Sequence, residues 1–405
     1  MSAITPNFLE LRCGVQYYQW GERRHGSRLP FIAALRGLEV AGDTPFAELW
    51  IGAHPGFPAQ VRHDGGFQPL NLLIKREPVA VLGAQAVAAG ASELPFLLKV
   101  LSCEQALSIQ AHPDRGLARS LHARDPKNYP DSQPKPELAI ALTPFDALTY
   151  FRPVADIRRD VDRHPPLRRL LAATGVAPGL EPQSWLRLAY SALFRAPATL
   201  IGEIVSALEK EIRHAPARDD YDAWFLALQE MYPGDRGVLS LFFLNLVHLE
   251  PGEAIFIGAG EPHSYLRGTI IECMANSDSV VRAGLTAKFV DIEVLLEMLT
   301  YSDGGVRRVA PTALSDGVAA FVPPTPDFQV DFLRGGAGAT LVLESADQAS
   351  LLLVLNGEAR LRTSRDTETA APRGSTWLWP ACLASAEIGF VAPETEIVRA
   401  HPNQF

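Results

Sequence analysis

The sequence predicts a mainly β protein with an α-helical insertion, in which the strands build jelly rolls. Three observations favour this fold class. Short apolar segments, broken by Gly, Pro and Asp, fill residues 8–150 and return after about residue 238. Between them, residues 153–232 place apolar side chains at helical spacing. The short, evenly spaced strands of the second half are typical of double-sheet jelly rolls.

The first β region is expected to span residues 1–152. Its candidate strands are FLELRCGVQYY, FAELWIGAH, FLLKVLSC, ALSIQAH and ELAIALTPFDALTYF. Two of its segments are expected to form short helices, LNLLIKREPVAVLG and DRGLARSLHARD. Asp114 stands where an N-cap residue of the second helix would accept a backbone hydrogen bond.

The insertion is expected to span residues 153–235. Its candidate helices are VADIRRDVDR, PLRRLLAAT, SWLRLAYSALFR, ATLIGEIVSALEKEIRHA and DYDAWFLALQEMY, and Pro or Gly separates most of them. Four aromatic side chains of these helices are interpreted as core rather than as a ligand site: Trp185, Tyr190, Phe194 and Trp224.

Two further β segments are expected after the insertion, at residues 236–318 and 319–405. Strand character is expected from about residue 238, and LEPGEAIFIGAGEPHSYL reads as three strands separated by a Pro-Gly turn and a Gly turn. The segment DIEVLLEML is expected to be a short helix capped by Asp291. The last segment contains NGEARL followed by a strand that starts at Gly and ends at Pro, which predicts a jelly roll without metal ligands.

The composition is that of a soluble globular protein. The chain has 405 residues, of which 47% are hydrophobic and 20% charged, so two or three domains are expected. The net charge of -9 argues against nucleic acid as a partner. No apolar run is long enough to span a membrane, and no secretion signal is apparent. Four scattered cysteines predict reduced core thiols in a cytoplasmic protein, and we expect a monomer.

A candidate metal site stands out in the segments SIQAHPD, PKPE and GAGEPHSY. Gln110 and His112 lie two residues apart, so on an extended strand their side chains leave the same face. With Glu137 and His263 they could supply a mixed nitrogen and oxygen set around one divalent ion, leaving a position open for water or substrate. The ordinary alternatives are a polar strand face, a surface carboxylate and a turn histidine.

The same segments resemble the type I phosphomannose isomerase family. The resemblance is carried by SIQAHPD, by KPE about 25 residues on, and by HSYLRGTIIECMANSDSVVRAGLTAKF, with support from YYQWG, AELWIGAHPGFPAQV and PFLLKVLS. It covers nearly the whole chain. It implies a cupin-type fold in which residues 1–152 and 236–318 form the catalytic region. It also implies one zinc ion, interconversion of mannose 6-phosphate and fructose 6-phosphate, and a place in GDP-mannose biosynthesis.

The matching positions of the family imply a set of zinc ligands and the residues of a surrounding pocket. The zinc ligands are Gln110, His112, Glu137 and His263. The active-site arginine is Arg282. The remaining pocket residues are Trp20, Glu48, Lys99, Ser108, Lys135, Tyr265, Glu272, Asp278 and Lys288.

The chain departs from the family pattern at five positions. The family usually has Asn-His before KPE, where this chain has Gln133 and Pro134. It usually has Ala, Asn and Pro at the positions of Ser264, Ser279 and Ala287. The missing imidazole puts substrate orientation, rate or sugar preference in doubt more than the class of reaction.

Aldose–ketose isomerisation moves a proton between C1 and C2 through an enediol-type intermediate, and charge develops on the carbonyl oxygen. A Lewis-acidic zinc and an arginine suit that charge, and Arg282 is the candidate. The base could be Glu272, Asp278, Lys135 or a zinc-bound hydroxide; Glu272 lies in an apolar strand, where burial would raise its pKa. A structural Glu272 paired with a cation is the alternative. Lys99, Ser108, Arg282 and Lys288 are candidates for binding phosphate.

Two other functions stay open at the level of sequence. One is a phosphosugar-binding cupin that retains the ligands without catalysis, which the departures from the family pattern motivate. The other is an iron-dependent cupin oxygenase, against which the glutamine ligand and the KPE element argue.

Overall fold

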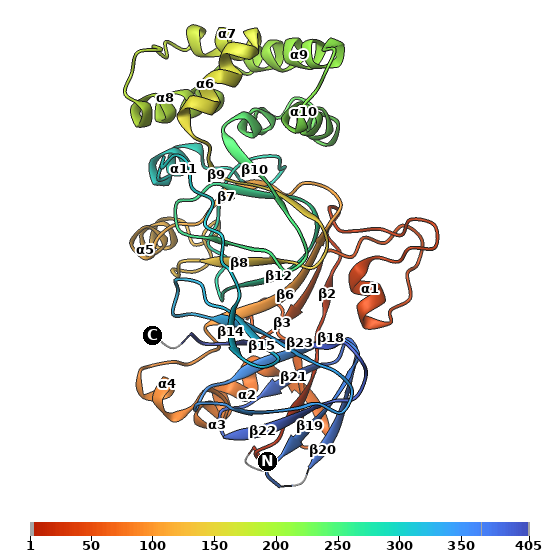
Figure 1. The fold of residues 1–405 in the computed structure, drawn as a ribbon. Helices are drawn as coiled ribbons and strands as arrows, with labels where there is room; N and C mark the ends of the chain where they lie inside the picture. Colours follow the sequence, from red (N-terminus) through yellow and green to blue (C-terminus); the bar gives the residue numbers. More distant parts are fainter. Residues whose placement is uncertain (1–3, 366, 404–405) are drawn as a thin grey trace.

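The computed structural model describes residues 4–365 and 367–403. Strands in three sheets build the body of the molecule, and five helices, α6 to α10, gather at one end of it (Figure 1). A mainly β protein with a helical insertion was predicted, and this is confirmed. The strands form sheets of ten, nine and four members.

The ten-stranded sheet lies next to the helical end (Figure 1). Its long strand β12 pairs with β6, β8, β9 and β7 along different parts of its length. This sheet consists of β2 (Val15–Gln16), β3 (Glu48–Ile51), β6 (Phe96–Cys103), β7 (Ile109–Ala111), β8 (Glu137–Ala141), β9 (Phe145–Phe151), β10 (Leu244–Leu249), β11 (Ala254–Ile257), β12 (His263–Ala275) and β13 (Val281–Gly284).

The nine-stranded sheet joins the two ends of the chain. β1 pairs with β21 so that Leu9 lies opposite Leu378. Its members are β1 (Leu9–Arg12), β4 (Gln60–His63), β5 (Gly66–Pro69), β14 (Thr312–Ser315), β15 (Val318–Phe321), β16 (Gln329–Gly335), β18 (Ser350–Asn356), β21 (Thr376–Trp379) and β23 (Thr395–His401). The strands of this sheet come from both sides of the predicted domain boundaries at residues 152 and 319. The division of the chain into four domains therefore stays a prediction.

The four-stranded sheet belongs to the C-terminal region and packs on the nine-stranded sheet. It contains β17 (Thr340–Glu344), β19 (Glu358–Thr363), β20 (Glu368–Pro372) and β22 (Ser385–Phe390). One apolar cluster joins residues of the nine- and four-stranded sheets, including Leu352, Trp379 and Ile388, all fully buried. The C-terminal segment is therefore β-rich, as predicted.

Helices outside the insertion flank the sheets. They are α1 (Phe31–Arg36), α2 (Leu70–Arg76), α3 (Pro78–Leu82), α4 (Ala84–Ala88), α5 (Arg115–Arg124) and α11 (Ile292–Met298). The side chains of Asp114 and Asp291 accept hydrogen bonds from the N–H groups of Leu117 and Val294, so both predicted N-caps are confirmed. The sequence patterns did not indicate α1 and α4.

The insertion contains α6 (Val154–Arg163), α7 (Pro165–Ala173), α8 (Pro182–Arg195), α9 (Ala198–His214) and α10 (Asp220–Met231). The 3-10 helix η1 (Arg236–Phe242) follows it. The expectation of strand character from residue 238 was therefore wrong, and β10 begins at Leu244. The reason is that the apolar run before Leu244 is fully buried, and periodicity alone does not separate a buried helix from a buried strand.

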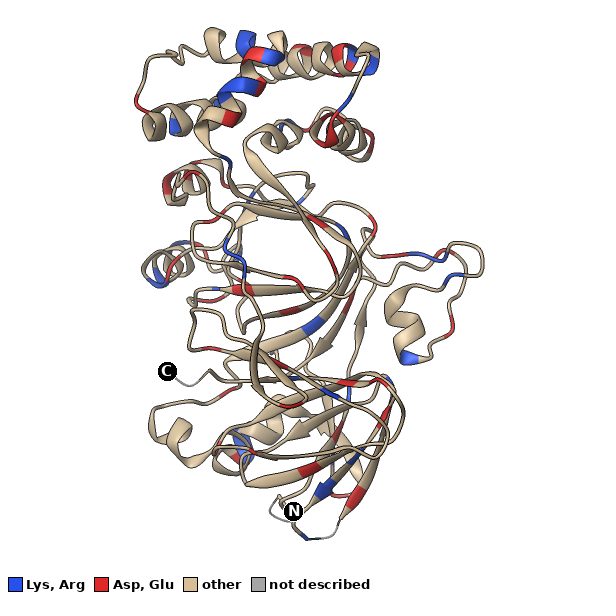
Figure 2. Ribbon diagram, in the orientation of Figure 1, with Lys and Arg blue, Asp and Glu red and all other residues tan. Residues whose placement is uncertain are grey.

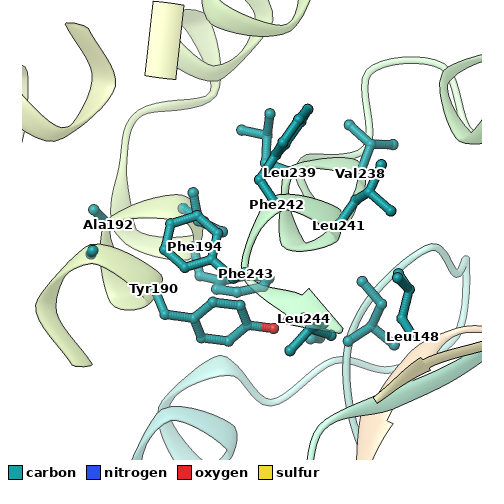
Figure 3. Packing of buried hydrophobic residues seen from close by; sticks show 14 of the residues in the cluster. Leu148, Tyr190, Ala192, Phe194, Val238, Leu239, Leu241, Phe242, Phe243 and Leu244 are labelled. Atoms are coloured by element: carbon teal, nitrogen blue, oxygen red, sulfur yellow. The ribbon is translucent and has the colours of Figure 1, made fainter. Parts of the chain in front are cut away.

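The insertion packs directly on the ten-stranded sheet. Tyr190 of α8 contacts Phe151 of β9, with ring centroids 4.9 Å apart and an interplanar angle of 85°. Figure 3 shows Tyr190 and Phe194 facing Phe243, and the centroids of Tyr190 and Phe243 are 5.6 Å apart. Trp185 and Trp224 are also buried in this cluster. The interpretation of the four aromatic side chains as core is confirmed.

Truncation of Trp185 to alanine should mainly lower the stability of the insertion. Its side chain is 3% exposed, and the guanidinium of Arg158 lies 4.9 Å from its ring centroid. The free energy of unfolding should fall by about 3–5 kcal/mol, because a large buried side chain leaves a cavity. Chemical denaturation measures this loss. Turnover should persist at low temperature, and a variant with reduced turnover but unchanged stability would contradict the assignment to the core.

Charge is distributed over the whole chain. Figure 2 shows Lys and Arg interspersed with Asp and Glu, including along the helices of the insertion. No single helix in residues 4–365 and 367–403 is long and apolar enough to cross a membrane, although α8 and α9 pass that test together as a pair bent by 104°. All four cysteines are free thiols; Cys103 and Cys273 are buried, and Cys13 and Cys382 are half-buried.

Candidate metal centre and substrate site

Three neighbouring strands bring the predicted metal ligands together. Gln110 lies in β7 and His112 follows that strand directly, while Glu137 and His263 are the first residues of β8 and β12. Strand pairing sets His263 opposite Gln110. β8 runs beside the other half of β12, where Glu137 lies opposite Met274. Pairing therefore brings together Gln110 and His263, which are more than 150 positions apart in the chain. Glu137 is aligned with the other end of β12, yet its side chain lies 3.4 Å from His263 in the folded sheet.

His112, Glu137 and His263 form a tight, buried cluster. One donor atom from each lies within 4.8 Å of the others. His112 Nε2 is 3.2 Å from Glu137 Oε1, and His263 Nε2 is 3.4 Å from Glu137 Oε2. All three residues are at most 1% exposed. Two imidazoles and a carboxylate at this spacing suit a divalent metal.

The orientation of both imidazoles supports the fit to a metal. His112 Nδ1 donates to the carbonyl of Ser279 (2.9 Å), and His263 Nδ1 donates to the carbonyl of Glu261 (3.1 Å). Because a carbonyl only accepts, each Nδ1 carries the proton and each Nε2 has a free lone pair. His112 Nε2 is buried and has no hydrogen-bond partner among the described residues, which leaves it free to bind a metal.

Gln110 reaches the same centre through its side-chain amide. The terminal nitrogen lies 3.3 Å from His263 Nε2, and Oε1 lies 3.4 Å from Ser108 Oγ. Rotation of the amide by 180° exchanges these two atoms without moving the rest of the side chain. In the rotated form Oε1 faces the metal cluster and the amide nitrogen donates to Ser108, so Ser108 would hold Gln110 in its ligating orientation.

The electrostatic environment favours a cation at this point. Burial is the main cause that lowers the pKa of His112 to about 4, so the ring is neutral at pH 7. Burial alone raises the pKa of Glu137, but Lys135 and then His112 lower it well below its usual value. Lys135 Nζ lies 2.9 Å from Glu137 Oε1. Tyr265 donates its hydroxyl to Glu137 Oε2 (3.3 Å).

Lys99 is held between two carboxylates next to this cluster. Its Nζ lies 3.0 Å from Glu272 Oε2 and 3.6 Å from Glu48 Oε1, and all three residues are buried. Burial by itself lowers the pKa of Lys99, but Glu272 and then Glu48 raise it more, so the ammonium persists. The three carboxylates of Glu48, Glu137 and Glu272 outnumber the ammonium groups of Lys99 and Lys135. A dication supplies the positive charge that this buried group lacks.

Glu272 has features of both roles that the sequence left open, a catalytic base and a structural carboxylate. It is 3% exposed and paired with Lys99, as a structural carboxylate would be. Burial also raises its pKa more than Lys99 lowers it, which is what a base working near neutral pH requires.

Arg282 and Lys288 form a second, more open group of cations. Arg282 lies opposite Gln110 in the pairing of β13 with β7. Its guanidinium is half-buried and makes no hydrogen bond or ion pair within residues 4–365 and 367–403. Burial lowers the pKa of Arg282, and the charge of Asp278 partly opposes this effect. The pKa of Lys288 is also lowered, first by burial and then by the charge of Arg282. Two neighbouring cations without bound carboxylates are suited to an anionic ligand.

Aromatic side chains flank the cations. Lys288 Nζ lies 5.6 Å from the ring centroid of Tyr18, and Tyr18 stacks at a tilt on Trp20 with centroids 5.6 Å apart. Trp20 is half-buried and Tyr18 is exposed. The structure therefore places Trp20 near Lys288, and adds Tyr18, which the sequence patterns did not single out.

Three of the positions that depart from the family pattern have local partners. Ser264 Oγ donates to the carbonyl of Leu107 (2.7 Å). Gln133 Oε1 accepts from Arg115 (2.9 Å) and is exposed. The carbonyl of Ser279 orients His112, while the buried hydroxyl of the same serine has no hydrogen-bond partner among the described residues. None of these contacts removes a donor from the metal cluster.

His54 is a buried residue next to this site that the sequence patterns did not indicate. Its Nε2 lies 3.3 Å from Asp278 Oδ2, and its side chain is 6% exposed. The histidine stands in the segment AELWIGAHPG without a second metal ligand at a characteristic spacing, so only its place inside that motif could have drawn attention to it.

Comparison with known proteins matches this arrangement to one family. The family model for the catalytic domain of type I phosphomannose isomerase matches residues 8–154. Mannose-6-phosphate isomerase of Macaca fascicularis is 37% identical over 388 residues, which cover 91% of this chain and 92% of that protein. Mannose-6-phosphate isomerase 1 of Arabidopsis thaliana is 35% identical, with coverage of 96% and 90%.

Solved structures agree along the whole chain. A variant of phosphomannose isomerase from Salmonella typhimurium superposes with a TM-score of 0.88 at 29% identity, covering 98% of this chain and 100% of that one. A zinc-bound crystal structure of mannose 6-phosphate isomerase gives a TM-score of 0.87 at the same identity and coverage. The predicted cupin-type fold class is thereby confirmed.

Proposed function

Because the chain belongs to the mannose-6-phosphate isomerase family of type I phosphomannose isomerases, we propose that it interconverts mannose 6-phosphate and fructose 6-phosphate with zinc as its cofactor. The observation that carries this proposal is the buried cluster of His112, Glu137 and His263, in which both Nε2 atoms converge on one carboxylate. Gln110 completes the proposed ligand set. When bound, zinc supplies a Lewis acid that polarises the substrate carbonyl.

The substrate phosphate is proposed to bind at Arg282 and Lys288. Both are cationic and neither has a carboxylate within hydrogen-bonding distance in the described part of the chain. Lys99 is a weaker candidate for this role than the sequence suggested, because Glu48 and Glu272 already surround its ammonium group. Ser108 is proposed to hold Gln110 and to line the site with Trp20 and Tyr265.

The proton transfer needs a base close to C1 and C2, and we propose Glu272. The carboxylate takes the proton from C2 of the open-chain aldose, and the electrons of the C–H bond form the enediol. The proton then goes to C1, while the proton of the C2 hydroxyl moves to the oxygen on C1, so the ketose forms without an external oxidant or reductant. Arg282 stabilises the developing charge on oxygen. Lys135 and Asp278 are proposed to orient the two oxygens.

A coupled assay tests the proposed reaction. Fructose 6-phosphate should form from mannose 6-phosphate, turnover should stop when a chelator removes the metal, and added Zn²⁺ should restore it. Metal analysis of the purified protein should find zinc. A zinc-loaded protein that binds mannose 6-phosphate without turnover would favour the non-catalytic binding function, and bound iron would favour the oxygenase.

The compartment, the oligomeric state and the pathway are part of the same proposal. The chain is proposed to act as a cytoplasmic monomer that supplies GDP-mannose biosynthesis, without nucleic acid or membrane as a partner. The four free thiols support a reducing compartment. Light scattering after size-exclusion chromatography measures the oligomeric state, and a mass near twice 44.1 kDa would contradict the monomer.

A further inference from the structure

His54 is buried and held in one orientation by its neighbours. It follows β3 and is 5% exposed. The backbone N–H of Gly56 donates to its Nδ1 (3.2 Å), so Nδ1 is the acceptor and Nε2 carries the proton. The ring of Trp50 packs edge-on against the imidazole, with centroids 5.0 Å apart and an interplanar angle of 82°. With Nδ1 occupied as an acceptor, the ring offers one directed donor, Nε2–H.

That donor points at Asp278. His54 Nε2 lies 3.3 Å from Asp278 Oδ2, and this hydrogen bond is the largest cause that lowers the pKa of Asp278. The carboxylate is therefore ionised and anchored through one oxygen. Its side chain is 51% exposed, so part of it stays open to a ligand.

The segment that carries Asp278 also supports the metal centre. The N–H of Asp278 donates to Asp131 Oδ2 (2.6 Å), and Ser277 Oγ donates to Asp131 Oδ1 (2.8 Å). The next residue, Ser279, orients His112 through its carbonyl. The carboxylate of Asp131 therefore helps to fix the position of this segment, and His54 is left to fix the direction of the Asp278 carboxylate.

We propose that His54 is a positioning residue for sugar recognition, which directs the Asp278 carboxylate so that its second oxygen accepts a hydrogen bond from a substrate hydroxyl. This inference rests on the proposed function. A carboxylate that accepts from a hydroxyl in a partly enclosed site contributes to substrate affinity, and an unanchored carboxylate would lose part of that contribution to side-chain freedom. His54 itself makes no contact with the metal ligands.

Two conservative variants separate this role from a packing role. In His54→Gln the terminal amide nitrogen takes the place of Nε2 and can still donate to Asp278. In His54→Asn the amide takes the place of Nδ1, so the contact with Gly56 can survive while the donor to Asp278 is lost. A residue needed only for packing would be damaged by both changes, whereas the proposal predicts opposite results.

The readouts are KM, kcat and zinc content measured with mannose 6-phosphate. His54→Asn should raise KM about 10-fold or more, the value of a hydrogen bond to a charged group, and change kcat less. His54→Gln should keep KM within about threefold, and both variants should retain zinc. Equal KM values for His54→Asn and the parent, or equal losses in both variants, would overturn the proposal.

Asp278→Asn provides the second measurement if His54→Asn does not fold. It should raise KM in the same way, and it should add little to the effect of His54→Asn, because the two residues act as one unit. Additive effects, or an unchanged KM in Asp278→Asn, would overturn the proposal. If the parent protein shows no turnover, the proposed function fails instead. Calorimetric binding of mannose 6-phosphate to the same variants then still tests the role of His54.

Discussion

Replacement of His263 by alanine should abolish zinc retention and isomerase turnover together. His263 is 1% exposed, and its Nε2 lies 3.4 Å from Glu137 Oε2 at the centre of the cluster. Without this imidazole, the remaining donors are a carboxylate, one imidazole and the neutral Gln110 amide, a weaker set than the two imidazoles and one carboxylate that hold catalytic zinc. His112→Ala should behave in the same way, because its Nε2 has no other partner in the described chain.

Metal content and turnover should be measured on the same preparations, by mass spectrometry and by the coupled assay. His214→Ala is a matched control, since His214 is an exposed residue of α9 that contacts the carbonyl of Lys210. This control should keep zinc and full turnover. A His263→Ala protein with the parent's metal content and activity would refute the ligand assignment.

Local patterns in the sequence were sufficient for the helices of the insertion. The run from Ala198 to His214 places apolar residues at helical spacing, and Ile201, Val205, Leu208 and Ile212 are buried as that period requires. Long amphipathic helices carry their own signal because one face must be apolar. The short run before Leu244 carried no such signal, since every residue from Gly237 to Phe242 is buried.

Contacts distant in sequence could not be predicted from periodicity. Nothing in the strand around Leu9 indicates a partner at Leu378, because an apolar face is compatible with many partner strands and no short turn connects these two. The metal cluster is similar. Gln110 and His112 could be placed on one strand face, but the pairing of His263 with Gln110 depends on a register that only the fold shows. The family resemblance supplied His263 as a ligand, without that register.

The ion pairs of Lys99 could not be predicted from the sequence either. Lys99 was one of four residues expected to bind phosphate. The structure instead sets it between Glu272, its direct partner on β12, and Glu48, which lies two residues along β3 from the direct partner Trp50. Trp50 Nε1 donates to the same Glu48 (2.7 Å), which further fixes this carboxylate. Cross-strand neighbours therefore decide which buried charged side chain remains available to a ligand. The sequence around each residue does not show this.

Replacement of Arg282 by alanine should leave zinc and the fold intact and lower kcat by about 10²–10³-fold, as expected for the loss of one group that stabilises developing charge. The fold should tolerate the change because the guanidinium makes no hydrogen bond or ion pair within residues 4–365 and 367–403. Its removal also relieves repulsion, since the charge of Arg282 lowers the pKa of Lys288. The free energy of unfolding should therefore stay within about 0.5 kcal/mol of the parent.

Arg282→Lys is the matched variant for this prediction. It keeps the charge but loses the planar fork of donors, so it should recover phosphate affinity better than turnover. Steady-state kinetics with mannose 6-phosphate separate the two, because lost phosphate binding raises KM and lost charge stabilisation lowers kcat. Zinc analysis and thermal unfolding on the same samples exclude indirect effects. If Arg282→Ala turned over within a few-fold of the parent, Arg282 would be at most a phosphate ligand, and the developing charge would have to be stabilised by the metal and Lys135.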